Sequence, residues 1–166
     1  MNTTRIVQIA AFIGFTVSSS LMVIIPIPGT GGIFTPIEVG IFVAASLFGA
    51  KEGALIGALS GVLVDLLSGF PQWAPFSLTI YAVVGAIVGF VANKRKSWAY
   101  IVLAFTLGGL IMVALYFLVT VWIYGFAAAL ASIIPNIVQS GFGGVGGGLL
   151  LKVWQTATTR KALSNS

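Results

Sequence analysis

The stretch Trp98–Tyr124 (WAYIVLAFTLGGLIMVALYFLVTVWIY) decides the fold class, because it contains no charged side chain over its whole length. A helix needs about 20 mainly apolar residues to cross the core of a bilayer, and this stretch is longer. In the whole chain, 58% of the residues are hydrophobic and 7% are charged, whereas soluble domains average about 25% charged residues. Long apolar runs without polar alternation favour helices over a β-barrel. We therefore expect an all-α membrane protein.

Further apolar runs lie on both sides of this stretch. They predict six transmembrane helices in a single domain of residues 1–166, at approximately residues 6–25, 37–50, 53–68, 74–92, 98–124 and 134–151. A Pro- and Gly-rich loop follows the first run, an apolar connector at 126–133 precedes the last, and a polar tail begins at residue 155. The first run has the length of a span and no Ala-x-Ala cleavage site follows it, so we expect a retained helix and not a signal peptide.

The basic residues fall into alternate segments between these spans. Arg5, Lys51, the group 94–96 and the group Lys152, Arg160 and Lys161 all lie in segments on one side of the membrane. Cytoplasmic loops carry the excess of Lys and Arg, so both termini are predicted to be cytoplasmic. This anchoring also accounts for the net charge of +5, and nucleic acid is not expected as a partner.

Hydrogen-bonding and aromatic side chains gather at the opposite, outer ends of the predicted spans. Asp65 continues a stride of small residues at positions 53, 57 and 61, so it lies on a helix face that packs against protein. We expect an outward-facing pocket for a small, flat, polar molecule, such as a heteroaromatic ring with hydroxyl or amino substituents. Its predicted binding residues are Glu38, Asp65, Gln72, Trp73, Tyr81, Tyr116, Asn136 and Gln139.

Structural roles remain open for several of these residues. An intramembrane carboxylate such as Asp65 marks a functional site by default, but it also fits a supporting role between helices. Glu38 fits an interfacial cap of the second span, and Trp73 fits an interfacial anchor.

Enzymatic chemistry is not expected. The chain has no cysteine and no histidine, which excludes thiol nucleophiles, the usual serine-hydrolase triad and the common zinc ligands. The segment at 141–146 (GFGGVG) matches a dinucleotide-binding pattern, but it lies inside an apolar run with no strand before it. Close helix packing explains this segment better, and no cofactor or metal is expected.

Four segments resemble a known family. They are LFGAKEGA at 47–54, DLLSGFPQWAPF at 65–76, and the pair YG at 124–125 with IPNIVQ at 134–139. Together with the size and the spans, they are similar to the S subunits of energy-coupling factor (ECF) vitamin transporters. The likeness covers nearly the whole chain and is greatest to the branch for hydroxymethylpyrimidine, pyridoxine or riboflavin.

This resemblance implies a vitamin-binding subunit of an ABC-type importer in the bacterial cytoplasmic membrane. Its implied partners are a transmembrane scaffold subunit and two ATPases, which drive toppling of the S subunit to deliver the vitamin. The family's Ala-x-x-x-Ala scaffold contact on the first span corresponds to Ala10 and Gly14, with glycine in the second place, and Ser18 continues that small face. Pocket residues differ within the family, so the substrate does not carry over. A stand-alone secondary transporter and a structural subunit of another membrane complex are the alternatives.

Overall fold

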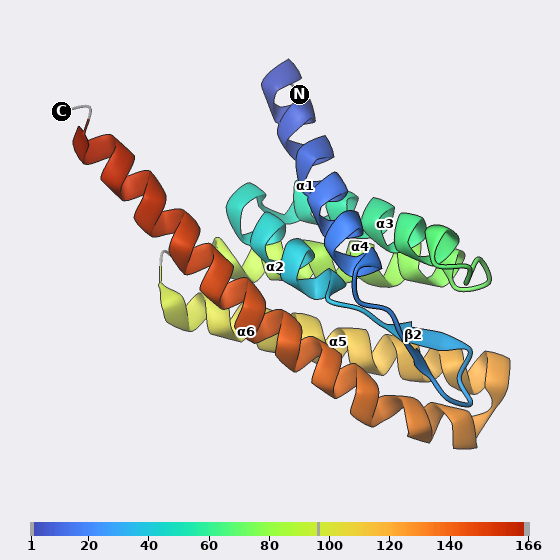
Figure 1. Ribbon diagram of the computed structural model, residues 1–166. Coiled ribbons are helices and arrows are strands. Elements are labelled where there is room, and N and C mark those ends of the chain that lie inside the picture. Colours follow the sequence, from blue (N-terminus) through green and yellow to red (C-terminus); the bar gives the residue numbers. More distant parts are fainter. Residues whose placement is uncertain (1, 96, 165–166) are drawn as a thin grey trace.

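The computed structural model describes residues 2–95 and 97–164, with side chains up to residue 158. Lys96 and the side chains of Arg160 and Lys161, which belong to the predicted cytoplasmic charges, lie outside this part. The described chain forms six helices and one β-hairpin (Figure 1). In order they are α1 (Thr3–Leu21), β1 (Ile25–Ile27), β2 (Gly32–Phe34), α2 (Ile37–Phe48), α3 (Ala50–Leu67), α4 (Ala74–Ala92), α5 (Trp98–Tyr124) and α6 (Phe126–Ser164).

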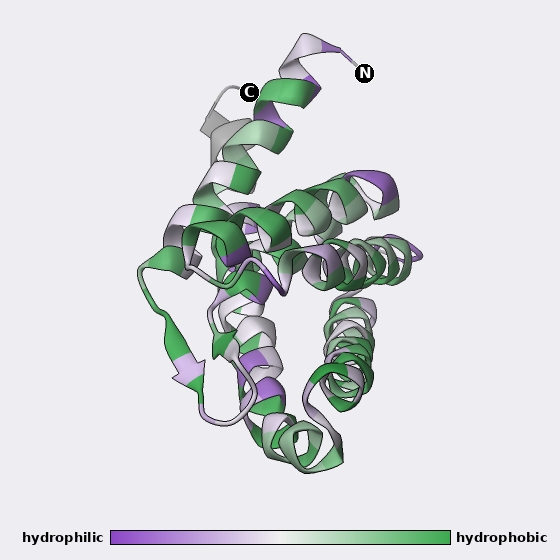
Figure 2. Ribbon diagram, turned by 90° about the vertical axis from the view of Figure 1, so that its right-hand side faces the viewer, coloured by the Kyte–Doolittle hydropathy of each residue, from purple (hydrophilic) through white to green (hydrophobic). Residues whose placement is uncertain are grey.

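The helices agree with an all-helical membrane protein. Within the described residues, α1, α4, α5 and α6 are long and apolar enough to cross a bilayer. Helix α2 is a shorter apolar helix, and α3 carries three charged residues, Lys51, Glu52 and Asp65. Most of the helical ribbon carries hydrophobic residues (Figure 2). Many large hydrophobic side chains are exposed, among them Trp122 of α5, with 78% of its surface exposed. A surface of this kind is stable only in an apolar solvent.

Short helix α2 forms the centre of the core. Ile41, Phe42 and Ala44 have no exposed surface, and the Phe42 ring stacks on Phe105 of α5 with 4.8 Å between ring centroids. Neighbouring helices therefore enclose α2 on all sides, which explains how a helix too short to span a bilayer by itself is accommodated.

The first helix ends earlier than the sequence predicts. Helix α1 ends at Leu21, and the apolar residues that follow form a hairpin in which Ile25 pairs with Phe34 and Ile27 with Gly32. Pro26 and Pro28 cannot donate the backbone hydrogen bonds of a continuing helix. Gly29 and Gly31 in the turn have positive φ angles of 78° and 59°, a conformation that favours glycine.

The last helix extends beyond the predicted span at both ends. The predicted connector and much of the polar tail belong to α6, which runs continuously through Pro135. Gly125, with a φ of 88°, separates α5 from α6 and lets the chain reverse direction at once. Proline within a helix is tolerated in membrane proteins because neighbouring groups satisfy the freed backbone carbonyl.

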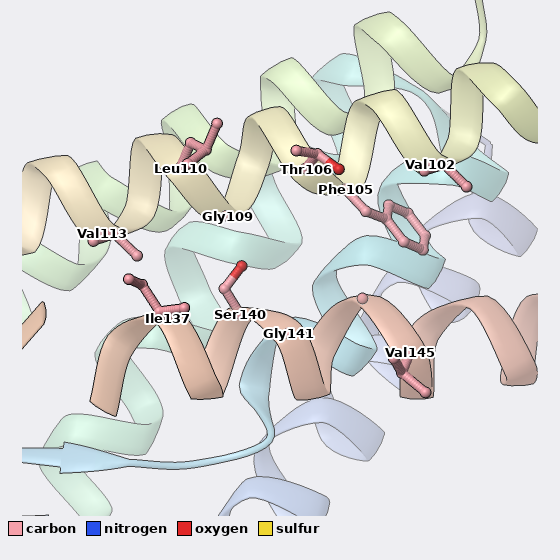
Figure 3. Close-up of a pocket in the computed structure, with 11 residues that line it drawn as sticks. Val102, Phe105, Thr106, Gly109, Leu110, Val113, Ile137, Ser140, Gly141 and Val145 are labelled. Atoms are coloured by element: carbon pink, nitrogen blue, oxygen red, sulfur yellow. The ribbon is translucent and has the colours of Figure 1, made fainter. Parts of the chain in front are cut away.

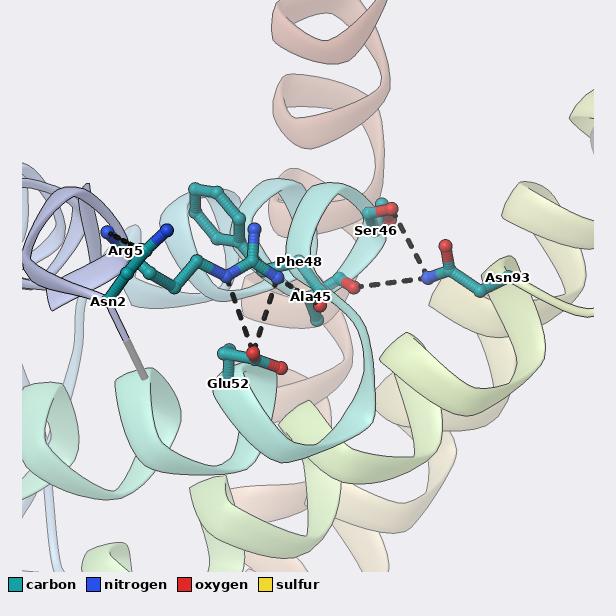
Figure 4. A network of polar contacts seen from close by, with 7 residues as sticks. All are labelled: Asn2, Arg5, Ala45, Ser46, Phe48, Glu52 and Asn93. Atoms are coloured by element: carbon teal, nitrogen blue, oxygen red, sulfur yellow. Dashed lines mark hydrogen bonds and ion pairs between the residues drawn. The ribbon is translucent and has the colours of Figure 1, made fainter.

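Polar contacts tie the ends of four helices, α1, α2, α3 and α4, together at one end of the bundle (Figure 4). Arg5 of α1 pairs with Glu52 of α3 at 3.3 Å and donates to the Phe48 carbonyl at 2.9 Å. Asn93, after α4, donates to the carbonyls of Ala45 and Ser46 at the end of α2. Lys51, Lys94 and Arg95 are neighbours in sequence of these residues, so the predicted gathering of cations corresponds to one end of the fold. Both chain termini lie on the same side of the molecule (Figure 1).

Candidate ligand-binding site

A small cavity of about 40 Å³ lies at the end of the bundle opposite the Arg5–Glu52 network. It is enclosed by β2, by the N-terminal parts of α2, α4 and α6, and by the C-terminal parts of α3 and α5. Helices α3 and α4 run in opposite directions. The start of α3 and the end of α4 therefore lie at the network end of the bundle, and the end of α3 and the start of α4 lie here. Its lining residues are Gly32, Ile33, Thr35, Ile37, Val64, Asp65, Trp73, Tyr81, Tyr116, Asn136 and Gln139.

Most of the predicted binding residues line this cavity. Those that do are Asp65, Trp73, Tyr81, Tyr116, Asn136 and Gln139. Glu38 is completely buried among residues that adjoin the cavity. Gln72 lies on the surface outside the cavity, where its amide donates to the Gly31 carbonyl at 3.5 Å. The structure therefore brings together all of the predicted residues except Gln72.

Aromatic rings form one wall of the cavity. Trp73 is 4% exposed, and its ring centroid lies 5.7 Å from that of Tyr116 and 6.0 Å from that of Tyr124. Tyr81 makes an edge contact with Tyr116 at 5.9 Å. The burial of Trp73 excludes the alternative in which it anchors the protein in the membrane interface. Such a wall offers ring faces to a flat ligand.

Hydrogen bonds to Gly31 and Thr35 hold the hairpin segment over the cavity. The Trp73 indole Nε1–H donates to the carbonyl of Gly31 at 2.7 Å. The Gln139 side chain accepts from the Thr35 backbone N–H at 2.9 Å, while its amide nitrogen donates to the Tyr81 hydroxyl at 3.2 Å. The sequence did not identify Gly31, Gly32 and Thr35 as part of the site, because the turn and the three-residue strand β2 show no periodicity long enough to recognise.

Three buried carboxyl oxygens at the site make no well-aligned hydrogen bond within the described residues. Within the described residues, neither carboxyl oxygen of Glu38 has one, and Oδ2 of Asp65 has none. The Gln139 amide is the polar group beside Glu38, and the Ser77 hydroxyl is the polar group beside Asp65. Buried polar groups are nearly always paired. Complete burial also excludes the alternative in which Glu38 is an interfacial residue.

A larger opening, of about 440 Å³, lies between α5 and α6 (Figure 3). Its walls are mostly aliphatic and include Val102, Leu110 and Val145, each more than 60% exposed. Ser140 points across it toward Gly109, and its lining contains no charged side chain. It is a groove in the apolar outer surface, and Thr106 and Ser140 are the only polar side chains that line it.

The predicted partner face on α1 is uncovered. Ala10, Gly14 and Ser18 are all exposed, and a Cβ added to Gly14 would meet nothing within 4 Å. The other face of α1 packs on the bundle through Ile9, Thr16 and Val17. The small residues therefore point away from the chain's own helices.

Comparison with known proteins gives consistent matches. A family model described as "ECF-type riboflavin transporter, S component" matches residues 1–156. The "Thiamine precursor transporter HmpT" of Lactococcus lactis subsp. cremoris (strain MG1363) is 34% identical over 139 residues, covering 83% of this chain and 80% of that protein. The "Uncharacterized protein in gap 3'region" of Pyrococcus woesei is 36% identical over 132 residues, covering 79% of this chain and 88% of that protein. The family match includes every element that lines the cavity.

Proposed function

Because the chain belongs to the family of ECF-type riboflavin transporter S components, we propose that it captures a small heteroaromatic vitamin or vitamin precursor from outside the cell. Hydroxymethylpyrimidine, pyridoxine and riboflavin are the candidate ligands. The observation that carries this proposal is the convergence of aromatic, amide and carboxyl side chains on one cavity beneath the hairpin. Ligand sites typically combine apolar walls with a few convergent polar groups in this way.

The proposed binding mode follows from the chemistry of the lining. The rings of Trp73, Tyr81 and Tyr116 would cover the faces of a flat ligand, and the amides of Asn136 and Gln139 would donate to or accept from its ring atoms and substituents. A cavity of about 40 Å³ has room for water only, since ligand sites measure about 300–1,000 Å³. Binding therefore requires outward movement of the hairpin, with loss of the Trp73–Gly31 bond. A single ring needs a smaller movement than the three fused rings of riboflavin.

We propose that all six helices cross the cytoplasmic membrane of a bacterial cell, with both termini in the cytoplasm. The cation-bearing end of the bundle would then face inward, as the bias of basic residues toward the cytoplasm requires. The cavity would open to the exterior. The uncovered face of Ala10, Gly14 and Ser18 would contact a transmembrane scaffold subunit, because small residues permit close helix approach. Two ATPases bound to that scaffold would supply energy, since the sequence contains no P-loop.

Calorimetric titration of the purified protein, without ATP or partner subunits, tests this function. We expect one of the three candidate ligands to bind, and at a hundredfold excess over its Kd to raise the free energy of unfolding by about 2.7 kcal/mol. Binding of none of them would overturn the proposal. Uptake of the bound ligand by cells that lack the scaffold and ATPases would instead support a stand-alone transporter.

A further inference from the structure

A cleft of about 410 Å³ opens at the cation-bearing end of the bundle, between the ends of α2, α4, α5 and α6. Its polar lining comes from Asn93, Arg95 and Ser97 before α5, and from Gln155 of α6. Trp98 also lines it and is 43% exposed, a partial burial typical of tryptophan at a membrane–water interface. Helix α5 begins at this residue, and a helix N-terminus attracts anions. The cleft therefore suits a negatively charged lipid headgroup.

Arg95 brings a positive charge to this cleft that the described side chains do not neutralise. Two of the chain's three acidic residues are buried at the cavity end, and the third, Glu52, is paired with Arg5. The Arg95 guanidinium instead lies over the ring of Tyr100, 5.6 Å from its centroid. A guanidinium presents a fork of N–H donors that matches the oxygens of a phosphate group. A phosphate would therefore supply the missing opposite charge.

An apolar groove continues from this cleft along the seam between α5 and α6. Ile101 lines the cleft, and its neighbour Val102 lines the groove of about 440 Å³ (Figure 3). On α6 the groove is lined by Gly141 and Gly144, where an added Cβ would meet nothing within 4 Å. The α5 lining runs from Val102 to Val113, a length of about 17 Å at 1.5 Å per residue. One leaflet contributes about 15 Å of hydrocarbon, so the groove has the length of an acyl chain within one leaflet.

We propose that an anionic phospholipid of the inner leaflet binds here, with its phosphate at Arg95 and the start of α5 and one acyl chain in the α5–α6 groove. A helix of a partner subunit would also fit an apolar groove, but it would leave the positive charge at the end of the groove without a partner. The combination of a cation with a groove of leaflet length favours the lipid. This inference goes beyond the proposed function, and only the choice of leaflet rests on the proposed orientation. Such a lipid would hold the cation-bearing end of the bundle at the membrane surface.

The headgroup contact can be tested by native mass spectrometry of the purified protein in detergent. The protein is titrated with phosphatidylglycerol or with phosphatidylcholine that carries the same acyl chains. We expect one phosphatidylglycerol to bind at least about fivefold more tightly, the contribution of one basic side chain at an anionic lipid surface. Arg95→Gln should remove this preference. Lys51→Gln is the matched control, because it removes the same charge from an exposed residue that does not line the cleft, and the preference should remain.

The acyl-chain contact can be tested with Gly144→Leu, whose side chain would fill the groove. Both lipids should bind about tenfold more weakly, the loss expected when two methylene groups of the chain lose their contacts. Ala127→Leu adds a similar side chain at an exposed position of α6 outside the groove, and lipid binding should stay at the wild-type value. Thermal unfolding in detergent checks that both variants are folded.

Equal binding of the two lipids by the wild-type protein would overturn the inference, as would an unchanged preference in Arg95→Gln. An equal loss of preference in Lys51→Gln would also overturn it, because the charge would then act without a defined site. If Gly144→Leu leaves lipid binding unchanged but abolishes uptake by cells with the complete transporter, the groove binds a partner helix and the inference fails. Vitamin binding in the calorimetric titration is a separate measurement, so the proposed function stands or fails independently of these outcomes.

Discussion

Replacing Gly61 by alanine should impair both stability and ligand binding, because this glycine sits where α3 meets the ring of Tyr81. An added Cβ would lie 2.7 Å from Cδ2 of Tyr81 and 3.0 Å from the carbonyl oxygen of Ser77. Carbon atoms pack at about 3.5 Å or more, so the ring or the helix must move by about 0.8 Å. The ring has little freedom, since Tyr81 is 4% exposed and its hydroxyl accepts from Gln139.

The size of the effect follows from two opposing terms. Overpacking a core by one methyl group costs about 1–3 kcal/mol. Removing a glycine from a helix returns about 0.5–1 kcal/mol. We expect a net loss of about 0.5–2 kcal/mol in the free energy of unfolding. The displaced Tyr81 ring also narrows the cavity. If this costs the same amount, about 0.5–2 kcal/mol of binding free energy, ligand affinity should fall by about two- to thirtyfold.

Gly148→Ala is the matched control for Gly61→Ala. It makes the same change within α6, where an added Cβ meets nothing within 4 Å, so stability and affinity should stay at or slightly above wild type. Thermal unfolding in detergent and calorimetric titration with the bound vitamin measure the two quantities. If Gly61→Ala behaves like Gly148→Ala in both assays, the close packing of α3 on Tyr81 does not shape the site.

Further predictions concern the aromatic wall, the amide and the partner face. Trp73→Ala should lower ligand affinity at least about tenfold, because ring stacking stabilises a complex by more than the buried contact area alone. Trp122→Ala makes the same change at a residue that is 78% exposed, and affinity measured by calorimetry should stay unchanged. Asn136→Ala should weaken binding by about tenfold by removing a hydrogen-bonding group, and unchanged affinity in both site variants would mean that the pocket is elsewhere. Ala10→Trp combined with Gly14→Trp should abolish uptake in cells with the complete transporter and leave ligand binding intact, and an equal loss of binding would assign this face of α1 to the core.

The sequence predicted helix bounds best where an apolar run is clearly delimited by the composition of its flanking residues. Helices α4 and α5 have the predicted bounds, because their apolar runs are flanked by turn-forming residues at 69–73 and by the basic loop after residue 93. The hairpin at 25–34 was missed because three-residue strands in an apolar run resemble the end of a membrane helix. The continuation of α6 through Pro135 was missed because proline usually marks a helix boundary, and only neighbouring helices make its interior position acceptable.

Site residues could be predicted where helical periodicity shows which side chains point toward the protein interior. Asp65 and Tyr81 share faces with glycines, and those glycines pack closely in the structure, so both side chains point inward. Gln72 and Trp73 lie in a turn without periodicity. Only the fold reveals that the Trp73 indole turns into the cavity while the Gln72 amide stays at the surface. The contribution of Thr35 depends on Gln139, more than a hundred positions away, which no local pattern encodes.

The outward-facing orientation of the cavity can be tested by single-cysteine labelling, because the chain has no native cysteine. Gln72→Cys places a thiol on the surface at the cavity end, and Lys94→Cys places one on the surface at the cation-bearing end. In intact cells, a membrane-impermeant maleimide should label Gln72→Cys, and it should label Lys94→Cys only after permeabilisation. Labelling of Lys94→Cys but not of Gln72→Cys in intact cells would reverse the orientation and contradict capture of a vitamin from outside.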